Sequence, residues 1–128
     1  MQIEMGKITH LEGPNLKPDG KKDDEQKGST WDIVDGAIKE HEMIIFAKST
    51  CPHCLELEQF LQRKGAEFSL VNLDLVPNGK EIQEELKKHT GQDTVPNTFV
   101  KGVHIGTKEQ SRDAWEDGKI QKLLKGEE

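Results

Sequence analysis

The sequence predicts an α/β domain in which a helix connects two parallel strands. Residues 43–47 and 68–75 are short, nearly continuous apolar runs, which is typical of strands covered on both faces. The segment between them has helical features, with Pro52 in its first turn and Gly65 at its end. Because strands joined by a helical crossover pair in parallel, these segments are expected to form one β-α-β unit.

A further helix is expected on each side of this unit. Ser29 or Thr30 can cap the first helix, over residues 32–41. Its apolar side chains recur at helical spacing. The second helix covers residues 78–90, and Gly91 ends it.

The C-terminal part of the chain predicts a hairpin and two helices. Residues 97–100 and 103–105 are short apolar runs on either side of a Lys-Gly turn. Thr107 and Gln110 have the spacing of a capping box, which starts the next helix. The last helix has an apolar stripe that consists of Ile120, Leu123 and Leu124. The expected order of elements is therefore α, βαβ, α, ββ, α, α.

The first 30 residues lack the features of a folded segment. They are rich in Gly, Pro, Lys and Asp, and apolar periodicity stops after Leu16, so they bury too little surface to offset the entropy of ordering. Hydrophobic residues make up only 32% of the whole chain, which fits such a segment. We expect a disordered N-terminal extension over residues 1–30 and a single domain over residues 31–128.

Charge and hydropathy exclude several classes of partner. The formal net charge is −6, whereas general binders of nucleic acid or anionic membranes need a basic face. No window approaches the roughly 18 apolar residues that a membrane span requires. The N-terminus shows neither a signal-peptide nor a transit-peptide pattern. We expect a cytoplasmic monomer with no nucleic-acid partner and no membrane partner.

Both cysteines of the chain lie in a Cys-Pro-His-Cys motif at the start of the predicted crossover helix. Cys51 precedes the helix, where free backbone N–H groups and the positive end of the helix dipole favour a thiolate. Lys48 adds a nearby positive charge. Cys54 lies within the first turn and nearer the core, which favours a thiol that resolves a mixed disulfide formed at Cys51. The motif therefore indicates a redox pair that exchanges disulfides with substrates.

Two structural interpretations of the cysteine pair stand beside the redox one. A structural disulfide would close so small a loop that it constrains the unfolded chain little, and a reducing cytosol would not maintain it. A structural zinc ion needs four ligands, and only scattered histidines are available to complete the set. The redox interpretation is favoured because the motif follows a strand and opens a helix in a β-α-β unit.

Three motifs together resemble the dithiol glutaredoxins. They are KSTCPHC, EIQEELKKHTG and TVPNTFVKGVHIG, in the order and approximate spacing of that family. The resemblance covers residues 31–125. It implies a thioredoxin fold, an α/β fold with a central four-stranded mixed sheet flanked by helices. It also implies glutathione-dependent reduction of glutathionylated and disulfide-bonded proteins, with glutathione as co-substrate and no metal.

The resemblance further implies roles for individual residues. Cys51 attacks and carries glutathione, and Cys54 resolves protein disulfides. The implied glutathione-binding residues are Lys48, His53, Gln83, Thr94, Val95, Pro96, Gly106, Thr107, Lys108 and Glu109. Lys48 and Gln83 are expected at the glycyl carboxylate, and the Thr-Val-Pro segment, with a cis proline, at the cysteinyl part. The glycine turn and the helix start after it are expected to hold the γ-glutamyl end.

Three positions depart from the family pattern. His53 replaces the usual aromatic residue between the cysteines, and it either stabilises a thiolate on Cys51 or is simply exposed. Thr107 replaces the second glycine of a pair, so a positive φ there would strain a β-branched residue. Asp93 stands where the family often has a basic residue, which is expected either to weaken affinity for anionic glutathione, unless Lys108 offsets it, or to shift the preference for protein partners.

Other functions compete with the glutathione-dependent one. Glutaredoxin-like chains can bridge a [2Fe–2S] cluster between two protomers through a cysteine such as Cys51 and two bound glutathiones. That role is more often associated with a Cys-Gly-Phe-Ser site, and Pro52 counts against it. The motif also resembles that of the bacterial disulfide oxidase DsbA, whose inserted helical domain and export signal are missing from this sequence. Thioredoxin is disfavoured because the sequence lacks Trp-Cys-Gly-Pro-Cys.

Overall fold

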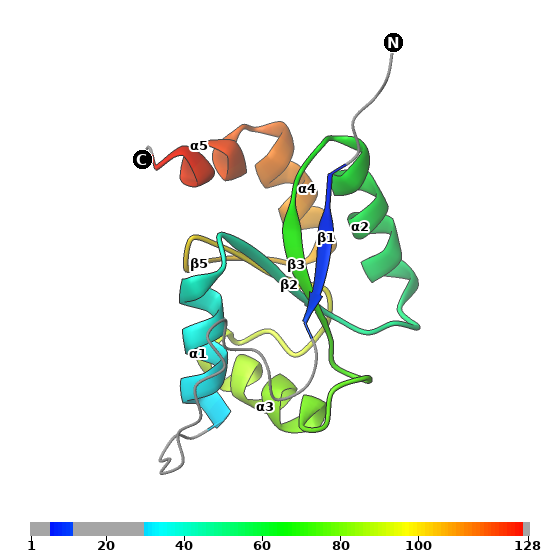
Figure 1. Cartoon of the computed structure of the whole chain (residues 1–128), viewed down its shortest axis with the longest axis vertical. Coiled ribbons are helices and arrows are strands. Elements are labelled where there is room, and N and C mark those ends of the chain that lie inside the picture. Colours follow the sequence, from blue (N-terminus) through cyan, green and yellow to red (C-terminus); the bar gives the residue numbers. More distant parts are fainter. Residues whose placement is uncertain (1–5, 12–29, 127–128) are drawn as a thin grey trace.

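A mixed sheet of five strands with helices on both faces forms the centre of the molecule (Figure 1). The computed structural model describes residues 6–11 and 30–126. The elements are β1 (Ile8–Leu11), α1 (Thr30–Glu40), β2 (Met43–Ala47), α2 (Pro52–Arg63), β3 (Phe68–Asn72), α3 (Gly79–Thr90), β4 (Asn97–Val100), β5 (Val103–Gly106), α4 (Lys108–Glu116) and α5 (Lys119–Lys125). None of the helices within these residues is long and apolar enough to cross a membrane.

The strand order is β1-β3-β2-β4-β5. Strands β2 and β3 pair in parallel, with Ile45 opposite Leu70, so the predicted β-α-β unit is confirmed. Strand β4 pairs antiparallel with β2, and β5 pairs antiparallel with β4, which confirms the predicted hairpin. Because β2 is the central strand, the loop that follows it begins at its C-terminal end, between the ends of the neighbouring strands.

The first strand corrects two expectations from the sequence. Strand β1 pairs in parallel with β3, so the sheet has five strands rather than four, and the predicted disorder of residues 1–30 is wrong over this strand. The Gly6 N–H donates to the Gln62 carbonyl at 2.9 Å, and Gln62 Nε2 donates to the Gly6 carbonyl at 3.2 Å. A four-residue edge strand held by such distant contacts has too short a pattern to be recognised from sequence. Residues 12–29 of the expected extension lie outside the described residues.

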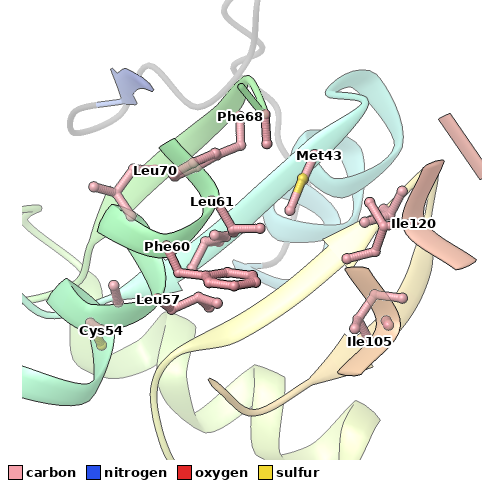
Figure 2. Packing of buried hydrophobic residues seen from close by; sticks show 14 residues of the cluster. Met43, Cys54, Leu57, Phe60, Leu61, Phe68, Leu70, Ile105 and Ile120 are labelled. Carbon is pink, nitrogen blue, oxygen red and sulfur yellow. The ribbon is translucent and has the colours of Figure 1, made fainter. Parts of the chain in front are cut away.

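Each face of the sheet has its own apolar core. Alternate residues of β2 point to opposite faces, as the strand geometry requires. Met43 and Ile45 pack with α2, α4 and α5, whereas Ile44 and Phe46 pack with α1 and α3. Figure 2 shows the first of these cores, where Leu57 of α2 packs beside Cys54. The core on this face therefore extends to the start of α2 and supports the cysteine motif.

One strand ends earlier than its apolar pattern predicts. Strand β3 ends at Asn72 rather than at residue 75. The Leu73 N–H still donates to the Ala47 carbonyl at 2.7 Å, but the chain then turns, and the Leu75 side chain is 68% exposed. The carboxylate of Asp74, in this turn, instead accepts hydrogen bonds from Ser49. The turn is thereby joined to the loop that carries the first cysteine.

Candidate active site

The first cysteine caps helix α2. Cys51 is the N-cap residue with extended backbone angles, and its Sγ accepts a hydrogen bond from the Cys54 N–H at 3.2 Å. The Cys51 N–H donates to the Lys48 carbonyl at 3.1 Å, which closes a turn just after β2. The sulfur thus occupies the position at a helix N-terminus where a negative charge is stabilised. Its predicted place before the helix is confirmed.

The two sulfurs differ in exposure. Cys51 is partly exposed, whereas Cys54 is completely buried, and both are free thiols. Figure 2 shows Cys54 beside Leu57. Burial raises the pKa of the Cys54 thiol, and the adjacent Cys51 raises it further. Cys54 is therefore a neutral thiol at physiological pH, and Cys51 is the sulfur that a substrate can reach.

The loop before the first cysteine is braced from the end of β3. The Ser49 N–H and Oγ donate to the Asp74 carboxylate at 2.9 Å and 2.5 Å. These bonds hold the pKa of the exposed Asp74 carboxyl below its usual value. Sequence reasoning missed this pair because its members are 25 residues apart and Asp74 belongs to none of the recognised motifs.

The Thr-Val-Pro segment faces the first cysteine. The peptide bond between Val95 and Pro96 is cis, as the resemblance implies. The Val95 carbonyl oxygen lies 3.9 Å from Cys51 Sγ. The Gln92 side chain donates hydrogen bonds to the Thr94 and Pro96 carbonyls at 2.9 Å and 3.0 Å. These two bonds hold the Thr-Val-Pro segment in place. Gln92 is a positioning residue that the sequence did not reveal.

Gln83 also supports this segment in the present structure. Its Nε2 donates to the Asp93 carbonyl at 2.9 Å. Lys48 lies near the Asp74 carboxylate, whose pKa it helps to lower. Lys48 thus lies on the loop before Cys51 and Gln83 on helix α3, and their expected contact with a glycyl carboxylate stays a prediction.

The start of helix α4 forms the far side of the site. The predicted capping box is confirmed, since Thr107 Oγ1 accepts from the Gln110 N–H at 3.2 Å and Gln110 Oε1 accepts from the Thr107 N–H at 2.9 Å. Thr107 has a φ of −76°, and it is Gly106 that has a positive φ, of 117°. The strain that we expected at Thr107 is therefore absent, because the preceding glycine makes the turn. The buried Ser111 hydroxyl donates to Thr98 Oγ1 at 2.9 Å and ties α4 to β4.

A cleft of about 170 Å³ lies between these segments. It contains most of the predicted glutathione-binding residues, and its lining is His53, Thr94, Val95, Pro96, Thr107, Lys108 and Glu109. These residues come from three distant parts of the chain, namely the start of α2, the loop before β4 and the start of α4. Lys48 and Gln83 do not belong to this lining, and Gly106 lies just beside it, before Thr107.

Comparison with known proteins gives the family. The family model described as Glutaredoxin matches residues 43–105. Glutaredoxin-C2 of Arabidopsis thaliana is 39% identical over 87 residues, which are 68% of this chain and 78% of that protein. The chain belongs to the glutaredoxin family. As a glutaredoxin it is an enzyme, a glutathione-dependent thiol oxidoreductase.

Solved glutaredoxin structures share the fold. The crystal structure of a buckwheat glutaredoxin–glutathione complex has a TM-score of 0.71 and 29% identity, covering 76% of this chain and 88% of that one. The holo form of glutaredoxin C1 from Populus tremula x tremuloides also has a TM-score of 0.71, with 26% identity, covering 77% and 98% of the two chains. The predicted thioredoxin fold is thereby confirmed.

The histidine between the cysteines has a specific partner in this glutaredoxin. Lys108 Nζ lies 3.2 Å from His53 Nδ1 and 2.6 Å from Glu56 Oε1. Because an ammonium group has no acceptor, Lys108 Nζ is the donor and His53 Nδ1 the acceptor in this hydrogen bond. The Lys108 ammonium thus lies beside the cysteine motif, and a role of His53 in stabilising a thiolate on Cys51 stays a prediction.

Replacement of Gly106 by Ala is expected to destabilise the glutaredoxin by about 1–3 kcal/mol. The added Cβ would adopt an unfavourable positive φ and collide with the Gln110 side chain, which belongs to the capping box. Denaturant unfolding measures the effect. Gly36→Ala in helix α1 is the matched control, where a Cβ meets no atom within 4 Å and should stabilise by about 0.5–1 kcal/mol. Equal responses of the two variants would contradict this account of Gly106.

Glu58, one turn after Cys54 on α2, is expected to make stability depend on pH. Its side chain is 9% exposed, and burial raises the pKa of its carboxyl. A raised pKa means that ionisation costs the folded state, so stability is full below the unfolded-state pKa of about 4.3 and falls as pH rises through the folded-state pKa. Glu58→Gln should therefore match the wild type near pH 4 and exceed it at pH 8.

The measurement is the free energy of unfolding of both proteins in urea between pH 4 and pH 8. Glu84→Gln, an exposed change on α3, serves as the control and should show no such divergence. A difference between Glu58→Gln and the wild type that stays constant with pH, or that favours the wild type at pH 8, would show that the buried carboxyl is not penalised on ionisation.

Proposed function

We propose that this glutaredoxin reduces glutathionylated and disulfide-bonded proteins through Cys51 as nucleophile and Cys54 as resolving thiol. The observation that carries the proposal is the contrast between the two sulfurs. Cys51 Sγ is partly exposed at a helix N-terminus and faces the cleft segment at Val95, whereas Cys54 is buried. Such an enzyme contributes to redox homeostasis in a reducing compartment.

In the first step, the Cys51 thiolate attacks the glutathione sulfur of a glutathionylated protein. The new bond joins Cys51 Sγ to glutathione, and the bond between glutathione and the protein sulfur breaks. The protein leaves as a thiolate and takes a proton from water. The Cys54 N–H, at 3.2 Å from Cys51 Sγ, and the dipole of α2 stabilise the thiolate before attack.

In the second step, the thiolate of a second glutathione attacks the glutathione sulfur held on Cys51. Oxidised glutathione forms, and the Cys51 thiolate leaves. With a protein disulfide as substrate, Cys51 forms a mixed disulfide with one protein sulfur, and the Cys54 thiolate then attacks Cys51 Sγ. The Cys51–Cys54 disulfide forms and the protein thiolate leaves. Two glutathiones reduce this disulfide in turn and are released as oxidised glutathione. Cys54 must first lose its proton, which its raised pKa opposes.

The cleft accounts for the recognition of glutathione. The backbone of Val95 lies next to the nucleophile, and we assign the cysteinyl part of the tripeptide to the Thr94–Val95 segment that lines the cleft. The N-terminus of α4 supplies backbone N–H groups at Lys108 and Glu109 for the carboxylate at the γ-glutamyl end. We assign the glycyl carboxylate to Lys48 and Gln83, which lie outside the lining of the cleft.

The test is the consumption of NADPH in an assay that couples glutathione and glutathione reductase to the reduction of a glutathionylated peptide. The proposal expects saturable turnover that depends on glutathione. If the wild type is inactive there and is instead reduced by another dithiol donor, the proposed dependence of this site on glutathione is wrong.

Binding of a [2Fe–2S] cluster is the alternative function. The described residues contain no group of three or more His, Cys, Asp or Glu side chains that could hold a metal ion. Cys54 is buried, so one chain would offer Cys51 alone, and a second protomer and two glutathiones would have to complete the ligand set. Absorption in the visible range after anaerobic purification with glutathione would favour the cluster. The monomeric state and the cytoplasmic location stay predictions.

A further inference from the structure

The cation at the edge of the cleft is already paired within the protein. Lys108 lies at the first position of α4, and its Nζ lies 2.6 Å from Glu56 Oε1 on α2. The Lys108 side chain is only 13% exposed, whereas the Glu56 side chain is 61% exposed. The hydrogen bond from Lys108 also lowers the pKa of the Glu56 carboxyl. Lys108 is thus fixed in place, and Glu56 approaches it from the solvent side.

The same lysine lines the cleft. Lys108 and His53 both belong to the cleft lining, and Glu56 does not. The His53 ring, at 3.2 Å, accepts a second hydrogen bond from the ammonium and holds it at the boundary between cleft and solvent. A carboxylate that enters the cleft at this end therefore meets a cation whose charge Glu56 already neutralises.

We propose that Glu56 competes with the γ-glutamyl carboxylate of glutathione for the Lys108 ammonium. When glutathione binds, Lys108 exchanges the Glu56 carboxylate for this substrate carboxylate. The proposal rests on the proposed function, because it assumes that the cleft takes glutathione. It assigns the recognition of this carboxylate to the Lys108 side chain as well as to the Lys108 backbone N–H. Glu56 then sets how tightly the glutaredoxin holds its co-substrate.

The energetics favour this exchange. Glu56 is exposed, so its carboxylate returns to water at little cost when a ligand carboxylate replaces it. A ligand carboxylate gains both the ammonium and the backbone N–H groups at the start of α4. The buried stem of Lys108 keeps the ammonium near the cleft in both states.

The test is the affinity for S-methylglutathione, an unreactive analogue, measured by NMR titration alongside turnover in the coupled assay. Glu56→Gln removes the competitor, so binding should tighten by about threefold. Lys108→Met removes the cation, so binding should weaken by about tenfold. In the double variant, Glu56→Gln should give no further gain, because its effect acts through Lys108. Glu116→Gln, an exposed change at the other end of α4, should leave the affinity unchanged.

The outcomes separate this inference from the proposed function. If the wild type turns over substrate but Glu56→Gln binds the analogue no more tightly, Glu56 does not compete with the ligand for Lys108. The proposed glutathione-dependent activity then still holds. If Glu56→Gln tightens binding in a protein without turnover, the competition holds and the proposed activity fails. A threefold gain that persists in the Lys108→Met background would also overturn the inference, because Glu56 would then act on the ligand directly. A wild type that neither binds nor turns over glutathione would overturn both.

Discussion

Cys51→Ser is expected to abolish turnover of a glutathionylated peptide, with a loss of about a thousandfold or more. The serine hydroxyl is far less acidic than a thiol and forms no disulfide, so no step of the exchange can begin. Cys54→Ser should keep most of the activity on this substrate, because a second glutathione can release the adduct from Cys51. With a protein disulfide as substrate, Cys54→Ser should instead be strongly impaired.

The coupled assay with both substrates measures these effects for each variant. Circular dichroism provides the control for folding, since serine in place of the buried Cys54 introduces a hydroxyl into the core. Equal losses in the two variants on the glutathionylated peptide would contradict the separate roles of the two sulfurs. So would full activity of Cys51→Ser on either substrate.

Leu57→Ala is expected to have the largest effect on stability, a loss of about 2–5 kcal/mol. Leu57 is completely buried and packs under the cysteine motif, between α2 and the sheet (Figure 2). Alanine at this position loses the transfer free energy of the removed atoms and leaves a cavity next to Cys54. The lower midpoint in urea should come with an unchanged slope, because the folded state stays compact.

Leu55→Ala is the matched control for this experiment. It makes the same chemical change in the same helix, but Leu55 is 45% exposed, so we expect a loss below about 1 kcal/mol. Comparable losses at the two positions would show that α2 does not bury Leu57 against the sheet. The comparison therefore tests the packing of the helix that carries both cysteines.

The local patterns of the sequence predicted most of the helices and strands. The apolar run of β2, the proline and glycine that bound α2, and the Thr107 capping box are each specified by neighbouring residues. The end of β3 was predicted three residues too late, because apolar residues continue into the turn. The hydrogen bond from Ser49 to Asp74, in the turn after β3, cannot be predicted from local periodicity.

The features that sequence reasoning missed depend on contacts between distant residues. Strand β1 is recognisable only from its pairing with β3, some 60 residues away in register. Gln92 acts through carbonyls that a cis peptide bond brings near it. The pairing of Lys108 with Glu56 joins residues 52 positions apart. This last contact follows from the packing of α2 against α4. A single sequence specifies none of these tertiary contacts.

The measurement that tests the central claim most directly is the intact mass of the two cysteine variants after incubation with oxidised glutathione. Each variant retains one thiol, so a single glutathione adduct identifies the reactive sulfur. We expect Cys54→Ser to acquire the adduct rapidly on Cys51 and Cys51→Ser to stay unmodified, because Cys54 is buried and its pKa is raised. Faster glutathionylation of Cys51→Ser than of Cys54→Ser would contradict the assignment of Cys51 as the nucleophile.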